Sequence, residues 1–419
     1  MTRSRLACLA VGLLLSSAAN GQSQSVVVVG LPLMEYTSVS VADFDQDGRS
    51  DLVMSGELLN GTHVTRLYSF TERRVVPRPN TSDRIEAHYE QRPFISRPVF
   101  RGASAWLDFN QDGWMDLIVS GLSETEVTTN ERRLLPFTDM YRNQSGSGLT
   151  IQNGISLPGV YDGRVATGDL DNDGFPEIVL SGRTNDGLEF AVFRNVETLD
   201  AQANPIRTVA RSTDVFAPIQ ATSLDLVDVD GDGFKDIVAA GFTADSQPVL
   251  HAYRNINGQS FVPMTLDLDT GYFGSLVFGD LDRDGDVDVV TLAGTPSPGL
   301  LRGETRLFMN DGEGTFTEDS ERLSRFRPVP GLFLGGGQMM DFDGDSDVDI
   351  LLNGFVGLDN DEQQRMVILE QIDGQLLNIL DARSVRNGSV LMMDYDGNGR
   401  MDLFQVGRSG DQLVMQLFE

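Results

Sequence analysis

The sequence predicts an all-β protein, a β-propeller with seven blades of four antiparallel strands each. Three observations lead to this prediction. An acidic segment recurs seven times at intervals of 52 to 65 residues, and short strand-like runs surround every copy. No segment shows the sustained periodicity of an amphipathic helix. Repeats of this length with four short strands are typical of propeller blades, and a ring of seven lies within the usual range.

The acidic segments share one pattern of carboxylates and turn residues. They read DFDQDGRSDL from Asp43, DFNQDGWMDL from Asp108, DLDNDGFPEI from Asp169, DVDGDGFKDI from Asp228, DLDRDGDVDV from Asp280, DFDGDSDVDI from Asp341 and DYDGNGRMDL from Asp394.

The residues around each copy predict the four strands of a blade. Small and apolar residues come first, as in VSVA and RVATG, and an apolar run that ends in Gly follows, as in LVMSG and IVAAG. A third run ends in Asn in four repeats, MYRN, VFRN, AYRN and LFMN, and a fourth leads to the next copy, as in FVPMTLDL. These runs are rich in Val, Leu, Phe and Tyr and are bounded by Gly, Asn and Asp, which indicates strands.

The first and last strand-like runs predict how the ring closes. The run SVVVVGLPL at 25–33 precedes the first acidic segment. The last repeat ends after its third strand, DQLVMQLFE at 411–419, and therefore lacks a fourth. We expect the N-terminal strand to pair in the last blade, because this pairing removes two unpaired sheet edges.

Residues 1–21 have the pattern of a secretory signal peptide. Arg3 and Arg5 precede an apolar run from Leu6 to Leu15, and small residues follow. The run is shorter than the roughly 20 residues that span a bilayer. We therefore expect a propeller at 22–419 in a secreted protein, extracellular or periplasmic, without a membrane span. Cys8, the only cysteine, lies in the signal segment, so the mature chain would have no disulfide.

The net charge argues against nucleic acid as a partner, and many of the acidic residues lie in the seven repeated segments. The net charge is −30, from 62 acidic against 32 basic residues, which argues against binding to nucleic acid. The hydrophobic content of 40% is sufficient for a large core, unlike that of an acidic disordered chain. Positions one, three, five and nine of the seven segments together hold 26 carboxylates.

These positions predict calcium loops. Calcium takes oxygen ligands from alternate loop positions and needs a sharp turn at position six, where six of the seven copies have Gly and one has Ser346. The helical calcium hand has Glu at position twelve, but that position is never acidic here. The alternative is a set of empty acidic hairpins, in which neighbouring carboxylates would repel one another.

We expect up to seven Ca²⁺ ions, one per blade, with unequal affinities. Asn110 and Asn398 each replace a carboxylate and would weaken their loops. Ser346 would cost about 1 kcal/mol if its position requires a positive φ. The expected side-chain ligands are Asp43, Asp45, Asp47 and Asp51; Asp108, Asn110, Asp112 and Asp116; Asp169, Asp171, Asp173 and Glu177; Asp228, Asp230, Asp232 and Asp236; Asp280, Asp282, Asp284 and Asp288; Asp341, Asp343, Asp345 and Asp349; and Asp394, Asp396, Asn398 and Asp402.

These segments resemble FG-GAP and VCBS-type repeats, which form the propellers of integrin α-subunits and of many secreted bacterial proteins. The resemblance covers the mature chain, although the phrase that names the family is kept best only in YFGSLVFGD around Phe273. It implies that each loop joins the first and second strands of a blade. It also implies calcium ligands from the backbone carbonyls of Arg49, Trp114, Phe175, Phe234, Asp286, Asp347 and Arg400.

The expected function is that of an extracellular binding, adhesion or interaction scaffold, monomeric, with a protein or glycan as partner. The longer loops at 91–98, 122–136, 295–304 and 355–364 are expected on the face opposite the calcium loops, and 73–84 on the calcium face. Arg92, Arg97, Arg132, Arg133 and Arg302 would make the opposite face suitable for an anionic ligand; alternatively, these are solvated loops.

An enzyme that acts on polysaccharides, a lyase or hydrolase, is the alternative function. His63, His88 and His251 are scattered and form no catalytic pattern, so we expect no catalytic residues. We interpret His251 as structural and Trp106 and Trp114 as packing residues.

Overall fold

The protein is made almost entirely of β-strands. A computed structural model describes residues 25–79, 82–128, 131–268, 271–297, 300–324, 329–357, 364–372 and 374–419; the predicted signal segment with Cys8 lies outside them. Within these ranges there are 28 strands and one short helix, α1 (Ser320–Ser324). None of the described helices has the length and hydropathy that a bilayer span requires. The all-β prediction is confirmed.

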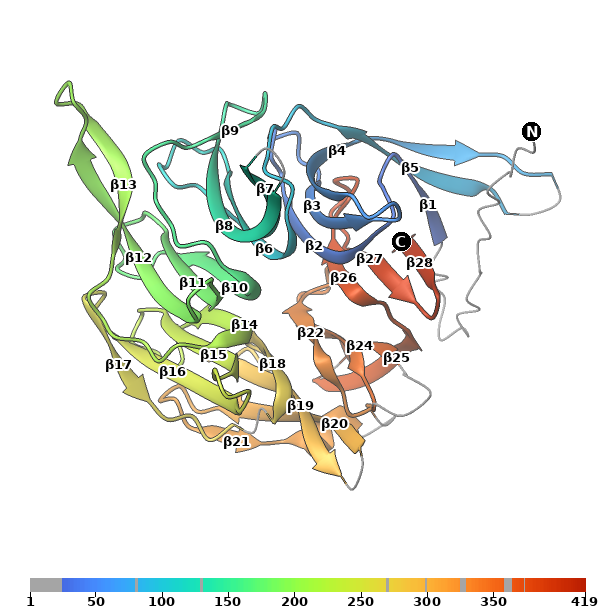
Figure 1. The fold of residues 1–419 in the computed structure, drawn as a ribbon. Coiled ribbons are helices and arrows are strands. Elements are labelled where there is room, and N and C mark those ends of the chain that lie inside the picture. Colours follow the sequence, from blue (N-terminus) through green and yellow to red (C-terminus); the bar gives the residue numbers. More distant parts are fainter. Residues whose placement is uncertain are drawn as a thin grey trace.

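The strands form seven antiparallel sets of four (Figure 1). The first three sets are β2 (Met34–Ala42), β3 (Asp51–Leu58), β4 (His63–Val76) and β5 (Arg84–Gln91); β6 (Phe100–Leu107), β7 (Asp116–Thr128), β8 (Glu131–Asn143) and β9 (Leu149–Ile151); and β10 (Tyr161–Gly168), β11 (Glu177–Arg183), β12 (Leu188–Leu199) and β13 (Pro205–Arg211). The fourth and fifth are β14 (Gln220–Val227), β15 (Asp236–Phe242), β16 (Pro248–Ile256) and β17 (Ser260–Met264); and β18 (Tyr272–Gly279), β19 (Asp288–Ser297), β20 (Leu300–Asn310) and β21 (Phe316–Glu318). The last two are β22 (Phe333–Met340), β23 (Asp349–Phe355), β24 (Gln364–Ile372) and β25 (Gln375–Arg383); and β26 (Arg386–Met393), β27 (Asp402–Ser409), β28 (Gln412–Phe418) and β1 (Ser25–Val29).

The sets follow one another in a ring. The first strand of each set contacts the first strand of the next, from β2 through β6, β10, β14, β18 and β22 to β26, and β26 contacts β2. Each acidic segment connects the first strand of a set to the second; Asp169, for example, begins the connection between β10 and β11. This arrangement is a β-propeller with the acidic loops on one face of the ring.

Strand β1 closes the ring by two pairings. It pairs antiparallel with β28, through Ser25 with Phe418 and Val26 with Leu417, as the sequence predicted. It also pairs parallel with β5, from Val26 opposite Ile85 to Val29 opposite His88. The second pairing was not predicted, and it joins the first and last sets into one eight-stranded sheet.

The core lies between neighbouring sets. The second strand of a set is buried on both faces; every residue of β15 is buried, for example. Ile118 of β7 and Leu180 of β11 belong to one apolar cluster built from two neighbouring sets. The continuous apolar runs that follow each acidic segment therefore attach each set to its neighbours and hold the loops in fixed positions.

Candidate metal centres

All seven acidic loops adopt the same turn. The carboxylate at position one accepts a hydrogen bond from the backbone N–H of position six, at 2.8–3.1 Å in every loop. The side-chain oxygen at position five accepts one from the N–H of position seven, at 2.8–3.0 Å. These local bonds fold the segment back on itself, so that alternate side chains point inward.

The turn requires two residues in the left-handed backbone region. Position six has a φ of 78–99° in all seven loops, which agrees with the expected Gly, and Ser346 adopts this conformation at 78°. Position four also has a positive φ, between 55° and 82°, and is occupied by Gln, Asn, Arg or Gly. The second position was not predicted, although the Asn in one copy and the Gly in three copies are residues that favour turns.

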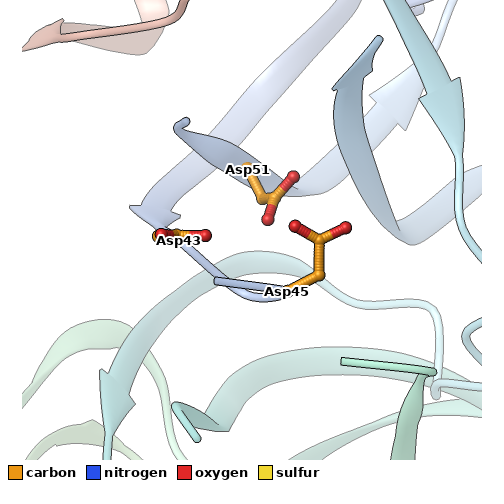
Figure 2. A group of neighbouring side chains, drawn as sticks. All are labelled: Asp43, Asp45 and Asp51. Carbon is orange, nitrogen blue, oxygen red and sulfur yellow. The ribbon is translucent and has the colours of Figure 1, made fainter. Parts of the chain in front are cut away.

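The carboxylates at positions one, three and nine converge on one point. Figure 2 shows this in the first loop, where Asp43, Asp45 and Asp51 point toward one another from the residue that follows β2, from the loop and from the start of β3. Oxygens of these three residues lie within 4.8 Å of one another. The same spacing holds for Asp169, Asp171 and Glu177; Asp228, Asp230 and Asp236; Asp280, Asp282 and Asp288; and Asp341, Asp343 and Asp349.

The acid at position nine anchors the loop to the sheet. In the third loop Glu177 is fully buried, and its two oxygens accept the backbone N–H groups of Leu170 at 2.8 Å and Asn195 at 3.2 Å. Burial raises the pKa of Glu177 to about 7. Burial also raises the pKa of Asp402 to about 7, and that of Asp51, Asp116, Asp236, Asp288 and Asp349 to about 6. A bound cation would offset this cost of burying negative charge.

Six loops contain a buried side-chain oxygen with no hydrogen-bond partner. These oxygens are Oδ1 of Asp45, Asn110, Asp169, Asp230, Asp280 and Asp396, each at position one or three of its loop. A buried carboxylate or amide oxygen without a partner is costly, whereas oxygens at these positions are the ligands that calcium prefers. The residues therefore fit the predicted Ca²⁺ ions.

An arginine lies beside the loop acids in three consecutive sets. The guanidinium of Arg142 is 3.3 Å from Asp112 Oδ2, that of Arg194 is 3.9 Å from Asp171 Oδ2, and that of Arg254 is 2.5 Å from Asp230 Oδ2. All three precede the Asn of the third strand in the sequence. Each arginine reduces the repulsion among the acids of its loop.

The Asn that follows each arginine connects two consecutive loops. Nδ2 of Asn143 donates to the carbonyl of Phe44, at position two of the first loop, at 2.9 Å, and to that of Met115 in its own loop at 3.1 Å. Its backbone N–H donates to Asp116, at position nine of its own loop, at 2.7 Å. One residue thus contacts the metal-binding turns of two sets.

Five residues make this contact, and we call them the inter-loop amides: Asn143, Asn195, Asn255, Asn310 and Gln371. Their side-chain bonds to the preceding loop measure 2.7–3.1 Å. Together they link loops one to six by hydrogen bonds, and the N–H of Met401 links the sixth loop to the seventh at 3.3 Å from the carbonyl of Phe342. The MYRN-type ends of the third strands were the visible signal, but they did not reveal this role.

A different contact joins the seventh loop to the first set. Phe70 on β4 takes the place that the inter-loop amide has in the second to sixth sets. It lies two residues after Tyr68, which pairs with Leu52, just as Asn143 lies two residues after Tyr141, which pairs with Leu117. The ring of Phe70 packs edge-on against Tyr395 of the seventh loop, with centroids 5.2 Å apart. Arg73 on β4 binds both oxygens of Glu419, at 2.7 and 2.8 Å. Aromatic packing and an ion pair therefore replace the amide at this junction.

Comparison with known protein families identifies two stretches of the repeats. A family described as FG-GAP-like repeat matches residues 108–180 and 228–291, which contain the second to fifth acidic loops. The chain contains FG-GAP-like repeats. The resemblance inferred from the acidic segments is confirmed on these stretches.

Solved structures with low sequence identity align with most of this chain. The K499G mutant of the sialidase NanB from Streptococcus pneumoniae is 8% identical over 93% of this chain and 68% of its own, with a TM-score of 0.39. Fructan 1-exohydrolase IIa from Cichorium intybus is 10% identical over 94% of each chain, with a TM-score of 0.34. TM-scores this low transfer neither an activity nor a substrate to this chain.

One prediction about the surface of the propeller is wrong. Arg92 was expected on the face opposite the calcium loops, but its Nη2 lies 3.7 Å from Asp45 Oδ2 in the first loop. The reason is the register of β5, because Gln91 pairs with Tyr68 close to that loop. Arg73, expected on the calcium face, does lie there, with its Nε 3.8 Å from Asp396 Oδ2.

Other basic residues expected to bind an anion already have partners, which are acidic for Arg97 and Arg132. Arg97 Nε is 2.9 Å from Asp139, and Arg132 Nη1 is 3.7 Å from Glu124. Arg302 forms a backbone bridge with Gly357, and Arg133 also has a partner. Residues 298–299 and 358–363 of the other expected loops lie outside the described residues. Each of the two ion pairs of Arg97 and Arg132 places a negative charge beside the guanidinium group.

His251 and Trp106 lie in packed surroundings, which agrees with their interpretation from the sequence, and His63 and His88 each contact a neighbouring side chain. His63 stacks on Phe100 at 3.9 Å between ring centroids, and His88 Nε2 lies 2.9 Å from Glu86. His251 is half-buried on β16, and burial lowers its pKa. The ring of Trp106 packs 6.4 Å from that of Phe44. The three histidines lie on three different strands.

Proposed function

We propose that this protein is a secreted calcium-binding propeller that acts as an extracellular scaffold for binding or adhesion. One observation carries the calcium part: six of the loops each bury an unpartnered oxygen, and in the first, third, fourth and fifth loops it belongs to a group of three converging carboxylates. Hard oxygen ligands without another partner are suited to Ca²⁺. The predicted signal peptide supports the extracellular part, since calcium modules outside cells work at the high calcium concentrations found there.

The chain's own residues would hold each ion in the same way. Side chains at positions one, three, five and nine and the carbonyl at position seven supply the ligands. Bound calcium would supply positive charge to these clusters, and seven ions would contribute 14 charges against the net −30. Because the ion binds the folded loop, its binding free energy adds to the stability of the ring.

The stabilised ring would then present rigid surface loops to an extracellular protein or glycan. Nothing in this role requires a catalytic step, and the protein would act as a monomer. Its adhesion or interaction partner would bind a surface whose shape depends on calcium.

A melting experiment tests the calcium part. The full mature chain is heated in excess calcium and in chelator, and the bound calcium is counted by mass spectrometry. We expect a Tm at least 10 °C higher in calcium, since several sites contribute. Asp230→Asn should reduce the bound calcium by one ion, whereas Asp245→Asn, an exposed residue in the β15–β16 turn, should not. An equal Tm in both conditions would contradict the proposal.

A second experiment separates binding from catalysis. The calcium-loaded protein is applied to a glycan array and incubated with the glycans that it retains. We expect retention without new reducing ends or unsaturated products. Turnover of a polysaccharide would contradict the scaffold role and support the alternative function, an enzyme that acts on polysaccharides.

A further inference from the structure

A cavity of about 330 Å³ lies between the second and third sets, beside the second acidic loop. Phe109 and Asn110 of that loop line it, together with Arg142 on β8 and Arg207 on β13. Its volume is within the range of sites that bind small molecules. Because two sets contribute to it, the cavity exists only in the assembled ring.

Two arginines line this cavity, although the protein is strongly acidic. Arg142 has one acid at its edge, Asp112, at 3.3 Å. Arg207 lies over the ring of Phe175, with its guanidinium carbon 3.3 Å from the ring centroid, and its Nη1 is 4.0 Å from Asp173 Oδ2. A guanidinium has five N–H donors, so both groups keep donors for a ligand. Arginine pairs of this kind recognise carboxylates.

The remaining lining is mixed in character. Phe109, Met140 and Ile155 provide an apolar wall, whereas the side chains of Gln152 and Asn153 provide amide donors and acceptors. Asp116 also lines the cavity, but it is buried and accepts backbone N–H groups, including that of Asn143 at 2.7 Å. Apolar walls pack against the C–H faces of a sugar ring, and amides bind its hydroxyl groups.

From this combination we propose that the cavity binds an acidic sugar, with its carboxylate held by Arg142 and Arg207. The inference rests on the proposed function, because Asn110 and Asp116 are positions three and nine of the second calcium loop. This loop has Asn in place of one carboxylate, so a bound ion there would keep more of its positive charge. An anionic ligand beside it would be favoured by calcium.

The test uses the full mature chain, saturated with calcium, and titration calorimetry with glucuronate and with glucose. We expect glucuronate to bind at least tenfold more tightly than glucose, because glucose lacks the carboxylate. Arg207→Gln and Arg142→Gln should each weaken glucuronate binding at least tenfold. Arg211→Gln is the matched control: it lies on the same strand as Arg207 but binds Glu189, and it should leave the affinity unchanged.

The outcomes distinguish this inference from the proposed function. A calcium-dependent rise of the Tm tests calcium binding separately in every variant. If that rise is normal but glucuronate and glucose bind equally, or neither binds, the acidic-sugar site is wrong. If Arg207→Gln binds glucuronate as tightly as Arg211→Gln, the carboxylate is held elsewhere and the inference fails. Chelator should weaken glucuronate binding at least tenfold, and equal affinity would overturn the calcium dependence.

Discussion

Replacing Asn195 by alanine should destabilise the ring at one defined place. Asn195 is an inter-loop amide and is buried, with 5% of its surface exposed. Its Nδ2 donates to the carbonyl of Phe109 in the second loop at 2.8 Å and to that of Pro176 in the third loop at 3.3 Å. Alanine removes both bonds but keeps the backbone N–H that donates to Glu177.

The expected loss follows from these two bonds. Each hydrogen bond contributes about 1 kcal/mol net, and a buried carbonyl left without a partner costs about 1–3 kcal/mol. We therefore expect Asn195→Ala to lower the free energy of unfolding by about 2–4 kcal/mol. Because the amide contacts two loops, calcium affinity should fall at both the second and the third loop rather than at one.

Urea denaturation in excess calcium measures the loss, and calcium titration of the folded variant measures the affinities. Asn204→Ala serves as control, since Asn204 is exposed in the β12–β13 turn and its Nδ2 bonds only to Asp200 at 3.0 Å. This control should lose less than about 1 kcal/mol. A loss of the same size in both variants, or a change of affinity at the third loop alone, would refute the linking role of Asn195.

Three further predictions concern single residues. Ser346→Gly should raise the free energy of unfolding by about 1 kcal/mol in urea, because Ser346 has a φ of 78°, and no gain would contradict strain at that turn. Arg73→Ala should lower the free energy of unfolding by about 1 kcal/mol in the same assay, because it removes the partly exposed ion pair with Glu419. An equal loss in Arg74→Ala, whose ion pair is with Glu72, would argue against a stabilising role of Arg73 between the first and last sets. Burial raises the pKa of Asp225 to about 6, against the opposing effects of its Ser223 hydrogen bond and of Arg164. Because its folded pKa lies above the unfolded value, Asp225 lowers the free energy of unfolding as the pH rises from about 4 to about 6. The free energy of unfolding of Asp225→Asn should therefore increase relative to that of the native chain across this range. A difference that does not change with pH would contradict this prediction.

The loops were predictable because their information is local. Asp at alternate positions and Gly at position six specify a nine-residue turn, and the structure forms that turn seven times. The apolar runs after each loop likewise specify strands that are buried on both faces. Ser346 could be identified as a strained residue from the sequence, since the requirement of position six depends only on the turn itself.

The contacts between sets were not predictable in this way. Asn143 bonds to Phe44, which is 99 residues away, and no local pattern names that partner. The position of Arg92 was predicted wrongly because it depends on the register of the long β4–β5 ladder, which the strand pattern does not fix. The cavity beside Asn110 requires residues from β8 and β13, which meet only after the ring has assembled.

The pairing of β1 has a consequence for the order of folding. Val26 pairs with Leu417, at the far end of the described chain, so this contact closes a very long loop and forms late. Until then the outer edges of β5 and β28 stay open and can pair with other strands. A chain that loses residues 25–29 to a protease and a chain cut short after β27 would therefore fail alike, with the ring open at the same junction.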